Sequence, residues 1–316
     1  MSPTNPRILP YGTAAIAEAA EVIRAGGCVA VPTETVYGLA ADASDSRAVA
    51  GIYAAKGRPS FNPLIVHVPD LAAAERIAVF DAAARSLALR FWPGPLTLVL
   101  PVRPGAAVAS LVTAGLDTIA LRVPDHRAMQ ALLAATGKPL AAPSANASGS
   151  ISPTRAEHVA ASLAGRIPLV IDDGPTPAGI ESTIVQGGRI LRPGPLGAAD
   201  LFPGGTDEAA AGAPASPGEG VTAPGQLESH YAPGKPVRLD AAARRGDEWL
   251  IGFGAVAGDD NLSPAGDLTE AAANLFDALH RADASQARAI AVAPIPATGI
   301  GVAINDRLRR AAHPRM

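Results

Sequence analysis

The chain has 316 residues and carries 26 Lys and Arg against 29 Asp and Glu, so its formal net charge is −3. This length favours two domains, or one large domain with a tail. The missing basic excess argues against a dedicated nucleic-acid-binding protein, and an aromatic content of only 4% disfavours the base-stacking surfaces of RNA-recognition sheets. Any anion-binding site must therefore be built locally.

Cysteine, glycine and proline usage narrow the class of protein further. The single cysteine, Cys28, excludes an intramolecular disulfide and any site built from several cysteines. Glycine (32 residues) and proline (30 residues) predict many turns in a chain that still folds. The first residues lack a basic segment followed by an apolar run, and no apolar stretch reaches the roughly 18 residues needed to span a bilayer. We therefore expect a cytoplasmic protein without membrane contact.

Helix-like and strand-like segments alternate over residues 10–202. Thr13 is expected to cap a first helix that ends at Gly26-Gly27. Further helices are predicted near residues 46–55, 70–90, 125–136 and 154–164. Short apolar runs predict strands at 28–31, 64–68, 96–100, 118–123, 168–171 and 182–185. This alternation predicts an α/β domain.

The composition changes after residue 202. Residues 203–236 are rich in Pro and Gly and poor in large apolar side chains, which predicts an interdomain linker. Beyond it the sequence predicts strands at 248–254 and 287–294 and helices at 268–282 and from about residue 300. This β-α-β-α order predicts a small parallel-sheet domain over residues 237–316.

The common nucleotide and metal motifs are absent from the sequence. There is no G-x-x-x-x-G-K-[ST], H-E-x-x-H or C-x-x-C, so a P-loop NTPase, a metal hydrolase of that type and a dithiol redox site are disfavoured. Gly299-Ile300-Gly301 precedes a predicted helix, whose first N–H groups could bind an anion. A tight turn that starts the helix is the favoured interpretation.

Polar residues gather instead at the ends of predicted strands, where ligands of open α/β sheets bind. Thr33, Glu34 and Thr35 follow the strand at 28–31, and taken alone they fit a capped turn as well as a site. Ser144 and other hydroxyl residues crowd the segment 142–154, which could wrap phosphates or simply cap a helix.

Basic residues form a second group of candidates. Lys56 and Arg58 lie two residues apart, and two cations held this close need an anion, which a polyphosphate would supply. Arg122 interrupts an apolar strand and must be paired there, either with a ligand carboxylate or with a structural Asp or Glu. Ser182 and Arg192 form the last cluster.

Together these clusters resemble the YrdC-like threonylcarbamoyl-AMP synthase family in its long, two-domain form. The resemblance rests on seven segments in the family's order, namely PTETVYGLA, KGRPSFNPLIVHV, PGPLTLVL, TIALRVPDH, APSANASGSISPT, GIESTIV and ILRPGPL. HYAPGKP at 230–236 and the final GIGVAINDRLRRAA are similar to the family's linker and C-terminal domain. The resemblance implies an N-terminal twisted mixed-sheet domain, a Pro/Gly-rich linker and a small C-terminal Rossmann-like α/β domain.

The resemblance also implies an activity. Family members condense L-threonine, bicarbonate and ATP into threonylcarbamoyl-AMP and pyrophosphate, and a partner transferase then modifies tRNA. Mg²⁺ is expected with the triphosphate, no protein metal ligand is assigned, and any RNA contact is expected to be weak. Such chemistry needs no protein nucleophile, because the site only has to position anions and neutralise charge.

The resemblance assigns site residues by position. Lys56 and Arg58 are expected to stabilise the leaving pyrophosphate. The implied ATP contacts are Lys56, Arg58, Asn62, Thr118, Ser144, Asn146, Ser152, Arg192 and Tyr231. The implied threonine contacts are Thr35, His67, Arg122, Ala142 and Ser182. Without the family, a strand histidine such as His67 is more often a hydrogen-bonded core residue.

Two other functions fit parts of the sequence. The first is a non-catalytic RNA- or ribosome-binding module that uses the same Lys and Arg side chains, although the net charge and the few aromatics argue against it. The second is a YrdC-like domain that carbamoylates another substrate, as in hydrogenase-maturation proteins. Those proteins carry zinc-finger segments, which the single cysteine argues against.

Overall fold

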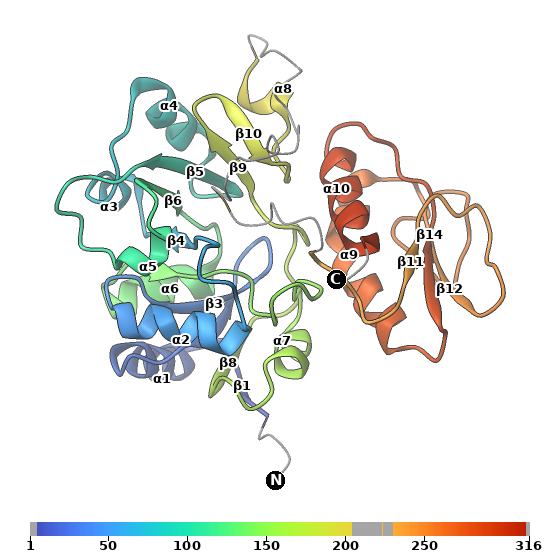
Figure 1. The fold of residues 1–316 in the computed structure, drawn as a ribbon, viewed down its shortest axis with the longest axis horizontal. Coiled ribbons are helices and arrows are strands. Elements are labelled where there is room, and N and C mark those ends of the chain that lie inside the picture. Colours follow the sequence, from blue (N-terminus) through green and yellow to red (C-terminus); the bar gives the residue numbers. More distant parts are fainter. Residues whose placement is uncertain (1–4, 204–222, 224–229, 314–316) are drawn as a thin grey trace.

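The computed structural model describes residues 5–203, 223 and 230–313. The strands of its N-terminal domain form one twisted mixed sheet (Figure 1). In their order across the sheet they are β1 (Arg7–Pro10), β8 (Leu169–Asp172), β2 (Val29–Pro32), β3 (Tyr37–Asp42), β7 (Leu140–Ala141), β4 (Ile65–His67), β6 (Thr118–Arg122), β5 (Leu96–Pro101), β9 (Thr183–Gln186) and β10 (Arg189–Arg192). The sheet contains parallel pairs such as β4 with β6 and antiparallel pairs such as β5 with β6, which confirms the predicted mixed sheet.

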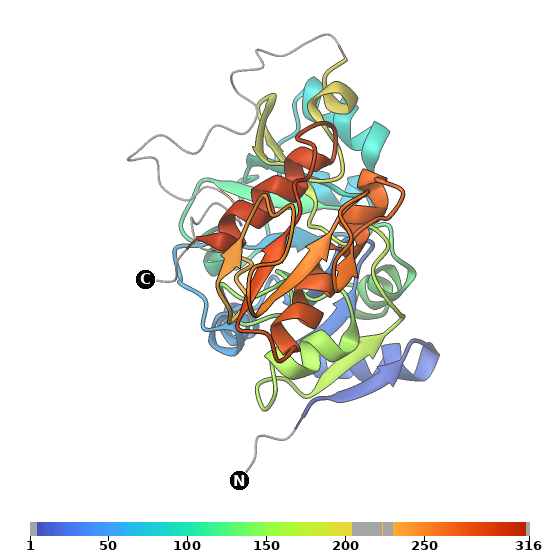
Figure 2. The ribbon, with the colours of Figure 1, turned by 90° about the vertical axis from the view of Figure 1, so that its right-hand side faces the viewer.

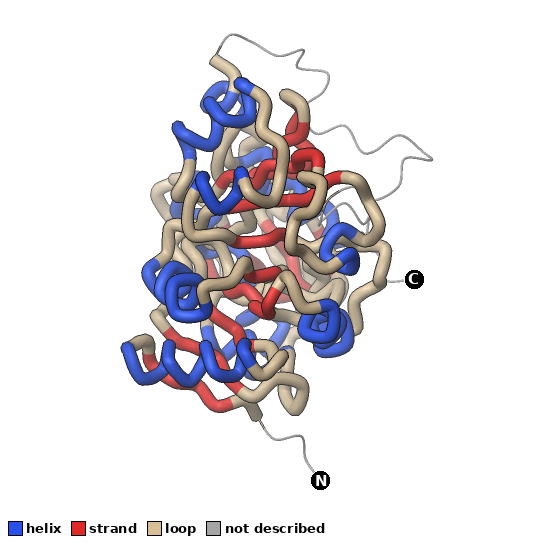
Figure 3. The backbone as a smooth tube through the Cα atoms, turned by 90° about the vertical axis from the view of Figure 1, so that its left-hand side faces the viewer, coloured by secondary structure: helices blue, strands red, loops and turns tan. Residues whose placement is uncertain are grey.

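Helices pack on both faces of this sheet (Figure 3). They are α1 (Thr13–Arg24), α2 (Ser46–Lys56), α3 (Leu71–Glu75), α4 (Ala82–Phe91), α5 (Ser110–Thr113), α6 (Arg127–Thr136), α7 (Ala156–Ser162) and α8 (Ala198–Leu201). Alternate strand residues enter different cores, because successive side chains point to opposite faces. Ala30 of β2 packs with Ile52 of α2, whereas Val31 packs with Ile16 of α1 and Leu132 of α6.

The structure corrects four local predictions. Thr13 does not cap α1, because it is already the first helical residue and Gly12 occupies the N-cap without a side-chain hydrogen bond. The helix predicted at 70–90 is two helices, because the Asp81 carboxylate caps a new start by accepting from Ala84 N. No strand was predicted at β3, whose residues pair antiparallel with β2. The strands β1, β7 and β10 were also not predicted.

The C-terminal domain is a small parallel sheet with two helices, as its β-α-β-α order predicted. The strands are β11 (Val237–Arg238), β14 (Ala289–Val292), β12 (Glu248–Gly252) and β13 (Asp260–Asn261), in that order across the sheet, and the helices are α9 (Leu268–Ala284) and α10 (Gly301–Ala312). Figure 1 shows both helices on the side of this sheet that faces the N-terminal domain, and Figure 2 shows the small domain in front of the large one. Gly299-Ile300-Gly301 forms the turn that starts α10, as favoured.

The two domains share apolar and polar contacts. Ile151 and Ile180 of the N-terminal domain are buried in one cluster with Phe276 of α9. Most of the predicted linker at 203–236 lies outside the described residues, apart from its first residue, Ala223 and 230–236. In the part of the chain that the structure describes, no helix is long and apolar enough to cross a bilayer.

Candidate functional site

The candidate site lies on the half of the sheet that α1 and α6 leave uncovered. There Ile65, Val99, Ala120 and Ile184, which come from β4, β5, β6 and β9, pack around Ala223 of the predicted linker. Residues two positions further along β4 and β6, on the same face, are polar and point into a pocket. A strand order that places β4 beside β6 therefore brings distant segments of the sequence to one site.

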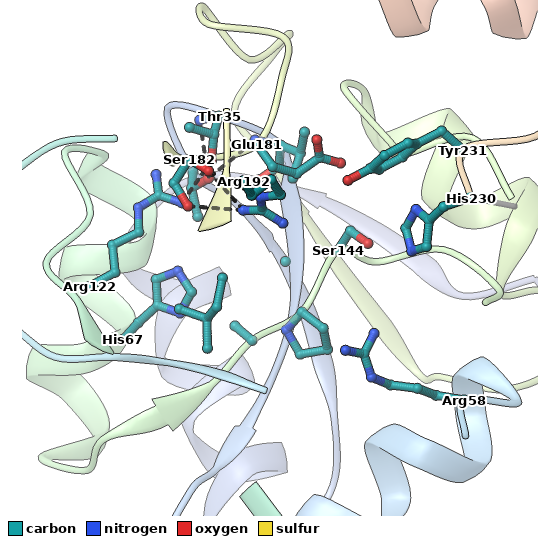
Figure 4. Close-up of a pocket in the computed structure, with 16 residues that line it drawn as sticks. Thr35, Arg58, His67, Arg122, Ser144, Glu181, Ser182, Arg192, His230 and Tyr231 are labelled. Atoms are coloured by element: carbon teal, nitrogen blue, oxygen red, sulfur yellow. Dashed lines mark hydrogen bonds between the residues drawn. The ribbon is translucent and has the colours of Figure 1, made fainter. Parts of the chain in front are cut away.

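The pocket has two opposing walls (Figure 4). His67 and Arg122 lie on one side, and His230 and Tyr231 lie on the other, with Arg192 between them. Nine of the predicted site residues line it, namely Thr35, Arg58, His67, Arg122, Ala142, Ser144, Ser182, Arg192 and Tyr231. The other predicted residues are not part of its lining, namely Lys56, Asn62, Thr118, Asn146 and Ser152.

Arg122 is nearly buried at the end of β6 and is paired within the protein. Its Nη1 donates to Thr35 Oγ1 at 2.8 Å, and its Nη2 lies 2.5 Å from Glu34 Oε1. Among the described residues, neither this nitrogen nor either Glu34 oxygen has a hydrogen bond of good geometry. The structure therefore supplies the acidic partner that the sequence left open, and it leaves hydrogen-bonding capacity unused at the guanidinium.

His67 of β4 lies beside Arg122 on the same wall. Burial, together with the positive charge of Arg122, lowers the pKa of His67 to about 3, so the imidazole is neutral at physiological pH. In the described part of the chain neither ring nitrogen has a hydrogen-bond partner. A buried imidazole without partners costs free energy, which a ligand in the pocket would recover.

Ser182 and Arg192 join the two walls. The Arg192 guanidinium donates from Nε and Nη2 to the Ser182 carbonyl, at 3.1 and 2.9 Å, and from Nη2 to Ser182 Oγ at 3.1 Å. Ser182 Oγ also lies 2.7 Å from Thr97 Oγ1. Burial lowers the pKa of Arg192 below its usual value, so this charge needs an anion nearby.

Arg58 is held at the other end of the pocket. It donates from Nη2 to Asn62 Oδ1 at 2.6 Å and to the Pro63 carbonyl at 2.8 Å. Burial, with Arg192 also contributing, lowers the pKa of Arg58 to about 10. Asn62 Nδ2 has no hydrogen-bond partner among the described residues. Asn62 is fully buried and contacts Arg58, but it does not line the pocket itself.

Lys56 does not line the pocket but supports a loop that does. Its Nζ donates to the carbonyls of Ser144 and Asn146, at 2.5 and 2.6 Å, at the C-terminal end of α2. This side chain therefore fixes the loop that presents Ser144 to the pocket, a role the sequence did not indicate. Burial, with Arg58 close by, holds the pKa of Lys56 well below its usual range. Buried cations this close together favour the binding of an anion.

Tyr231 and His230 close the pocket. Tyr231 adopts φ +61°, a left-handed conformation that costs a non-glycine residue free energy and is typical of functional sites. The next residue is tied down, because Ala232 N donates to the Gly149 carbonyl at 2.8 Å. Within the described residues, the Tyr231 hydroxyl and His230 Nδ1 lack hydrogen-bond partners. The free volume left inside is about 40 Å³.

Two acidic residues were missing from the predicted site. Glu181 lines the pocket, and its Oε1 accepts from Ser152 Oγ at 2.5 Å. Glu34 lies behind Arg122. Glu181 lies in the motif GIESTIV next to Ser182, and Glu34 lies in the motif PTETVYGLA next to Thr35. Their positions beside predicted contacts could have identified them. Over residues 5–203, 223 and 230–313, no group of three His, Cys, Asp or Glu side chains could hold a metal ion.

The fold and the site define a two-domain α/β protein with a buried cationic pocket beneath a tyrosine. A family model described as "Telomere recombination" matches residues 21–194, and one described as "Threonylcarbamoyl-AMP synthase, C-terminal domain" matches residues 197–313. The chain belongs to the threonylcarbamoyl-AMP synthase family, as its motifs predicted.

Relatives match this chain over nearly its full length. A threonylcarbamoyl-AMP synthase of Bacillus subtilis is 40% identical over 95% of this chain and 94% of its own. The crystal structure of P. abyssi Sua5 complexed with L-threonine is 36% identical, covers 98% of each chain and has a TM-score of 0.86. A P. abyssi Sua5 variant with an adjacent His-Tyr pair changed to alanines covers 97% of this chain and 96% of its own, at 35% identity and a TM-score of 0.86.

Proposed function

We propose that this protein condenses L-threonine, bicarbonate and ATP into threonylcarbamoyl-AMP and pyrophosphate. Family membership supports the reaction, and the pocket supports the substrates. The observation that carries the proposal is that His67 and Tyr231, whose buried polar atoms have no hydrogen-bond partner among the described residues, face one cationic pocket together with Arg122. Buried polar groups in folded proteins are usually satisfied, so this concentration favours a polar, anionic ligand.

Threonine binds at the wall formed by β4 and β6. The Arg122 guanidinium accommodates the carboxylate, for which its planar array of N–H groups is suited. The neutral His67 contacts the amino acid, and Thr35, Ala142 and Ser182 surround it. Because His67 carries no charge, it can donate one hydrogen bond and accept another without repelling the substrate's ammonium group.

ATP binds along Arg58, Ser144 and Arg192, with Tyr231 over it, and Lys56 acts on it through the Ser144–Asn146 loop and through its charge. The remaining predicted contacts, Asn62, Thr118, Asn146 and Ser152, lie outside the pocket's lining and are assigned only by the resemblance.

Threonine's amine and bicarbonate form a carbamate and release water. A carbamate oxygen then forms a bond to the α-phosphorus while the bond from that phosphorus to the bridging oxygen of pyrophosphate breaks. Arg58 and Arg192 neutralise the charge that grows on the leaving group.

The segment at His230 and Tyr231 opens to admit the substrates. A free volume of about 40 Å³ holds little more than a water molecule, whereas ligand pockets usually measure about 300–1,000 Å³. Closure over the bound substrates then keeps water from the carbamate and from the product, both of which hydrolyse.

Mg²⁺ is expected to accompany the triphosphate and to help neutralise its charge. The described residues do not form a site for it, because Glu181 is the carboxylate that lines the pocket, and Ser152 and Arg307 already occupy its oxygens. Mg²⁺ bound mainly through phosphates and water is common in such enzymes. No step of the proposed reaction is assigned to a protein-bound metal.

The product is a mixed anhydride of a carbamic and a phosphoric acid, which is activated for transfer. A tRNA-modifying transferase is the proposed consumer, and any RNA contact of this chain is proposed to be weak. Family membership favours this enzyme over a non-catalytic RNA-binding module. Pyrophosphate release from ATP and bicarbonate tests the proposal: it should require L-threonine, and L-valine and L-serine should be poor substitutes. Release that ignores the amino acid would refute it.

A further inference from the structure

Arg307 of α10 connects the C-terminal domain to the pocket. Its side chain is fully buried, and its Nε lies 3.1 Å from Glu181 Oε2 in the N-terminal domain. Nη1 donates to the Pro193 carbonyl at 2.5 Å, and Nη2 donates to the Glu181 carbonyl at 3.4 Å. One guanidinium from the small domain therefore holds two separate loops of the large one.

Both loops carry predicted substrate contacts. Glu181 precedes Ser182 in the chain, and Pro193 follows Arg192. These two neighbours of the Arg307 contacts are themselves joined by hydrogen bonds between the Arg192 guanidinium and Ser182. A shift of Arg307 would thus move residues assigned to threonine and to ATP.

The same guanidinium reaches the nucleotide side of the pocket through side chains. The Arg307 Cζ lies 5.4 Å from the centroid of the Tyr231 ring, within the range of a cation–π contact. Glu181, the ion-pair partner, accepts from Ser152 Oγ with its other oxygen. Tyr231 also packs against Phe276 of α9, at 5.5 Å between ring centroids. The C-terminal domain therefore supports the residue that closes the pocket.

Charge balance explains why an arginine stands here. Glu181 lines the pocket, where an unpaired carboxylate would repel a triphosphate. Arg307 neutralises it, and Asp306 lies 3.2 Å from Arg307 Nη1 on the other side. Asp306 also pairs with Arg310, with 3.1 Å between Oδ1 and Nε, so two carboxylates balance two guanidinium groups. The pocket therefore keeps the positive potential of Arg58 and Arg192.

We propose that Arg307 is a positioning residue, through which docking of the C-terminal domain builds the ATP side of the pocket. The proposal rests on the proposed function and gives the C-terminal domain a role in it. Arg307 contacts no reacting atom; it sets the position of Tyr231 and of the Glu181–Ser182 and Arg192–Pro193 segments.

The test compares Arg307→Met and Arg307→Lys with Arg155→Ala in the full chain. Arg155 pairs with Asp277 across the same domain interface, but this pair is partly exposed and neither residue lines the pocket. Both Arg307 variants should raise the KM for ATP roughly tenfold or more, because small displacements of positioning groups are costly. The KM for threonine should rise much less, because Ser182 adjoins an Arg307 contact whereas His67 and Arg122 are held by the paired strands β4 and β6. Arg155→Ala should leave both values near wild type.

Arg307→Lys separates positioning from simple loss of folding. Lysine keeps the ion pair with Glu181 but cannot also reach the Pro193 carbonyl, so this variant should melt near the wild-type temperature and still bind ATP poorly. Hydrogen exchange at 181–193 and 231–232 should rise in it, while exchange in β2 and β3 should not. A folded Arg307→Lys with wild-type ATP binding and exchange would overturn the proposal. So would proportional losses for both substrates that track the folded fraction of either variant.

Measuring the affinity for ATP directly makes this test independent of catalytic turnover. ATP titrated into the full chain by calorimetry reports the effect of Arg307 even without pyrophosphate formation. If the wild type binds ATP but makes no pyrophosphate, the proposed function fails. If the wild type turns over and the Arg307 variants bind ATP normally, only the role of Arg307 fails.

Discussion

Glu34 and Arg122 form a buried ion pair, with 2.5 Å between Oε1 and Nη2. Glu34 lies in the turn between β2 and β3, and Arg122 is the last residue of β6. The pairing of β3 with β7, of β7 with β4 and of β4 with β6 brings these ends of the sheet together. Because both side chains are almost excluded from water, each charge depends on the other. Arg122 is thus neutralised before any substrate binds, and the threonine carboxylate must share the guanidinium with Glu34.

Arg122→Ala should weaken threonine binding far more than ATP binding. Removing one partner of a desolvated charge pair costs about 2–5 kcal/mol, and the carboxylate belongs to the amino acid. Arg122→Lys should also bind threonine poorly, because one ammonium group cannot reproduce the planar fork. Calorimetric titration with each substrate separately measures the two affinities. Equal losses for threonine and ATP would show that Arg122 is only structural.

Glu34→Gln provides the matched control for Arg122. The amide oxygen keeps an acceptor beside Arg122, but the charge that competes with the threonine carboxylate is gone. We expect lower thermal stability from the unpaired buried guanidinium, together with unchanged or tighter threonine binding. Added threonine should therefore raise the melting temperature more in this variant than in the wild type. A parallel loss of stability and threonine affinity would contradict the shared-guanidinium account.

Arg58→Ala should lower the rate of pyrophosphate formation by roughly 100-fold, a loss typical of removing one donor that stabilises developing charge. The loss should include turnover, because charge on the leaving pyrophosphate grows toward the transition state.

Lys56→Ala should combine a similar loss with reduced stability, since Lys56 Nζ also holds the Ser144 and Asn146 carbonyls. Steady-state kinetics and thermal melts of both variants separate these effects. Normal turnover in a destabilised Lys56→Ala would make that residue structural.

His67 should make the protein less stable in acid. Its pKa is about 3 when folded, against about 6.5 for free histidine. The unfolded chain therefore binds the proton first, so stability is complete above pH 6.5 and is lost as the pH falls toward 3. Between pH 7.5 and pH 5 this one group should cost about 2 kcal/mol. Denaturant unfolding of wild type and His67→Asn at both pH values checks this, and an identical pH dependence would contradict it.

Much of this site could be predicted from the sequence because its residues disturb local patterns. Arg122 interrupts an apolar strand, and Lys56 and Arg58 form a close cationic pair, so each needed a partner. The order of helices and strands also predicted both domains. A charged residue in an apolar strand and two neighbouring cations each conflict with local packing preferences, and such conflicts are expected at functional sites.

Other features depend on contacts that local patterns do not encode. Nothing near Arg122 in the sequence marks Glu34 as its ion-pair partner, because sheet pairing brings them together. Arg307 lies in a C-terminal motif of low specificity, and its contact with Glu181 appears only when the domains dock. β3 was missed because its small residues, Gly38, Ala40 and Ala41, have weak strand preferences and are fixed by neighbours on both sides.

Replacing His230 and Tyr231 with alanines should release more intermediate to hydrolysis, or slow turnover, while both domains stay folded. In the wild type, ATP and threonine together should protect residues 230–236 from hydrogen exchange. Both effects follow if this segment closes over the substrates and excludes water. Unchanged exchange on adding both substrates, together with wild-type kinetics in the double variant, would leave the segment a passive connector.

The central claim is the reaction itself, and mass spectrometry of the product tests it most directly. The protein would be incubated with ATP, L-threonine and ¹³C-labelled bicarbonate, and the nucleotide products would be separated at once. The account predicts a threonine adduct of AMP that carries one labelled carbon, formed together with pyrophosphate and absent when threonine is omitted. An unlabelled threonyl-AMP, or AMP and pyrophosphate formed without any threonine adduct, would contradict it.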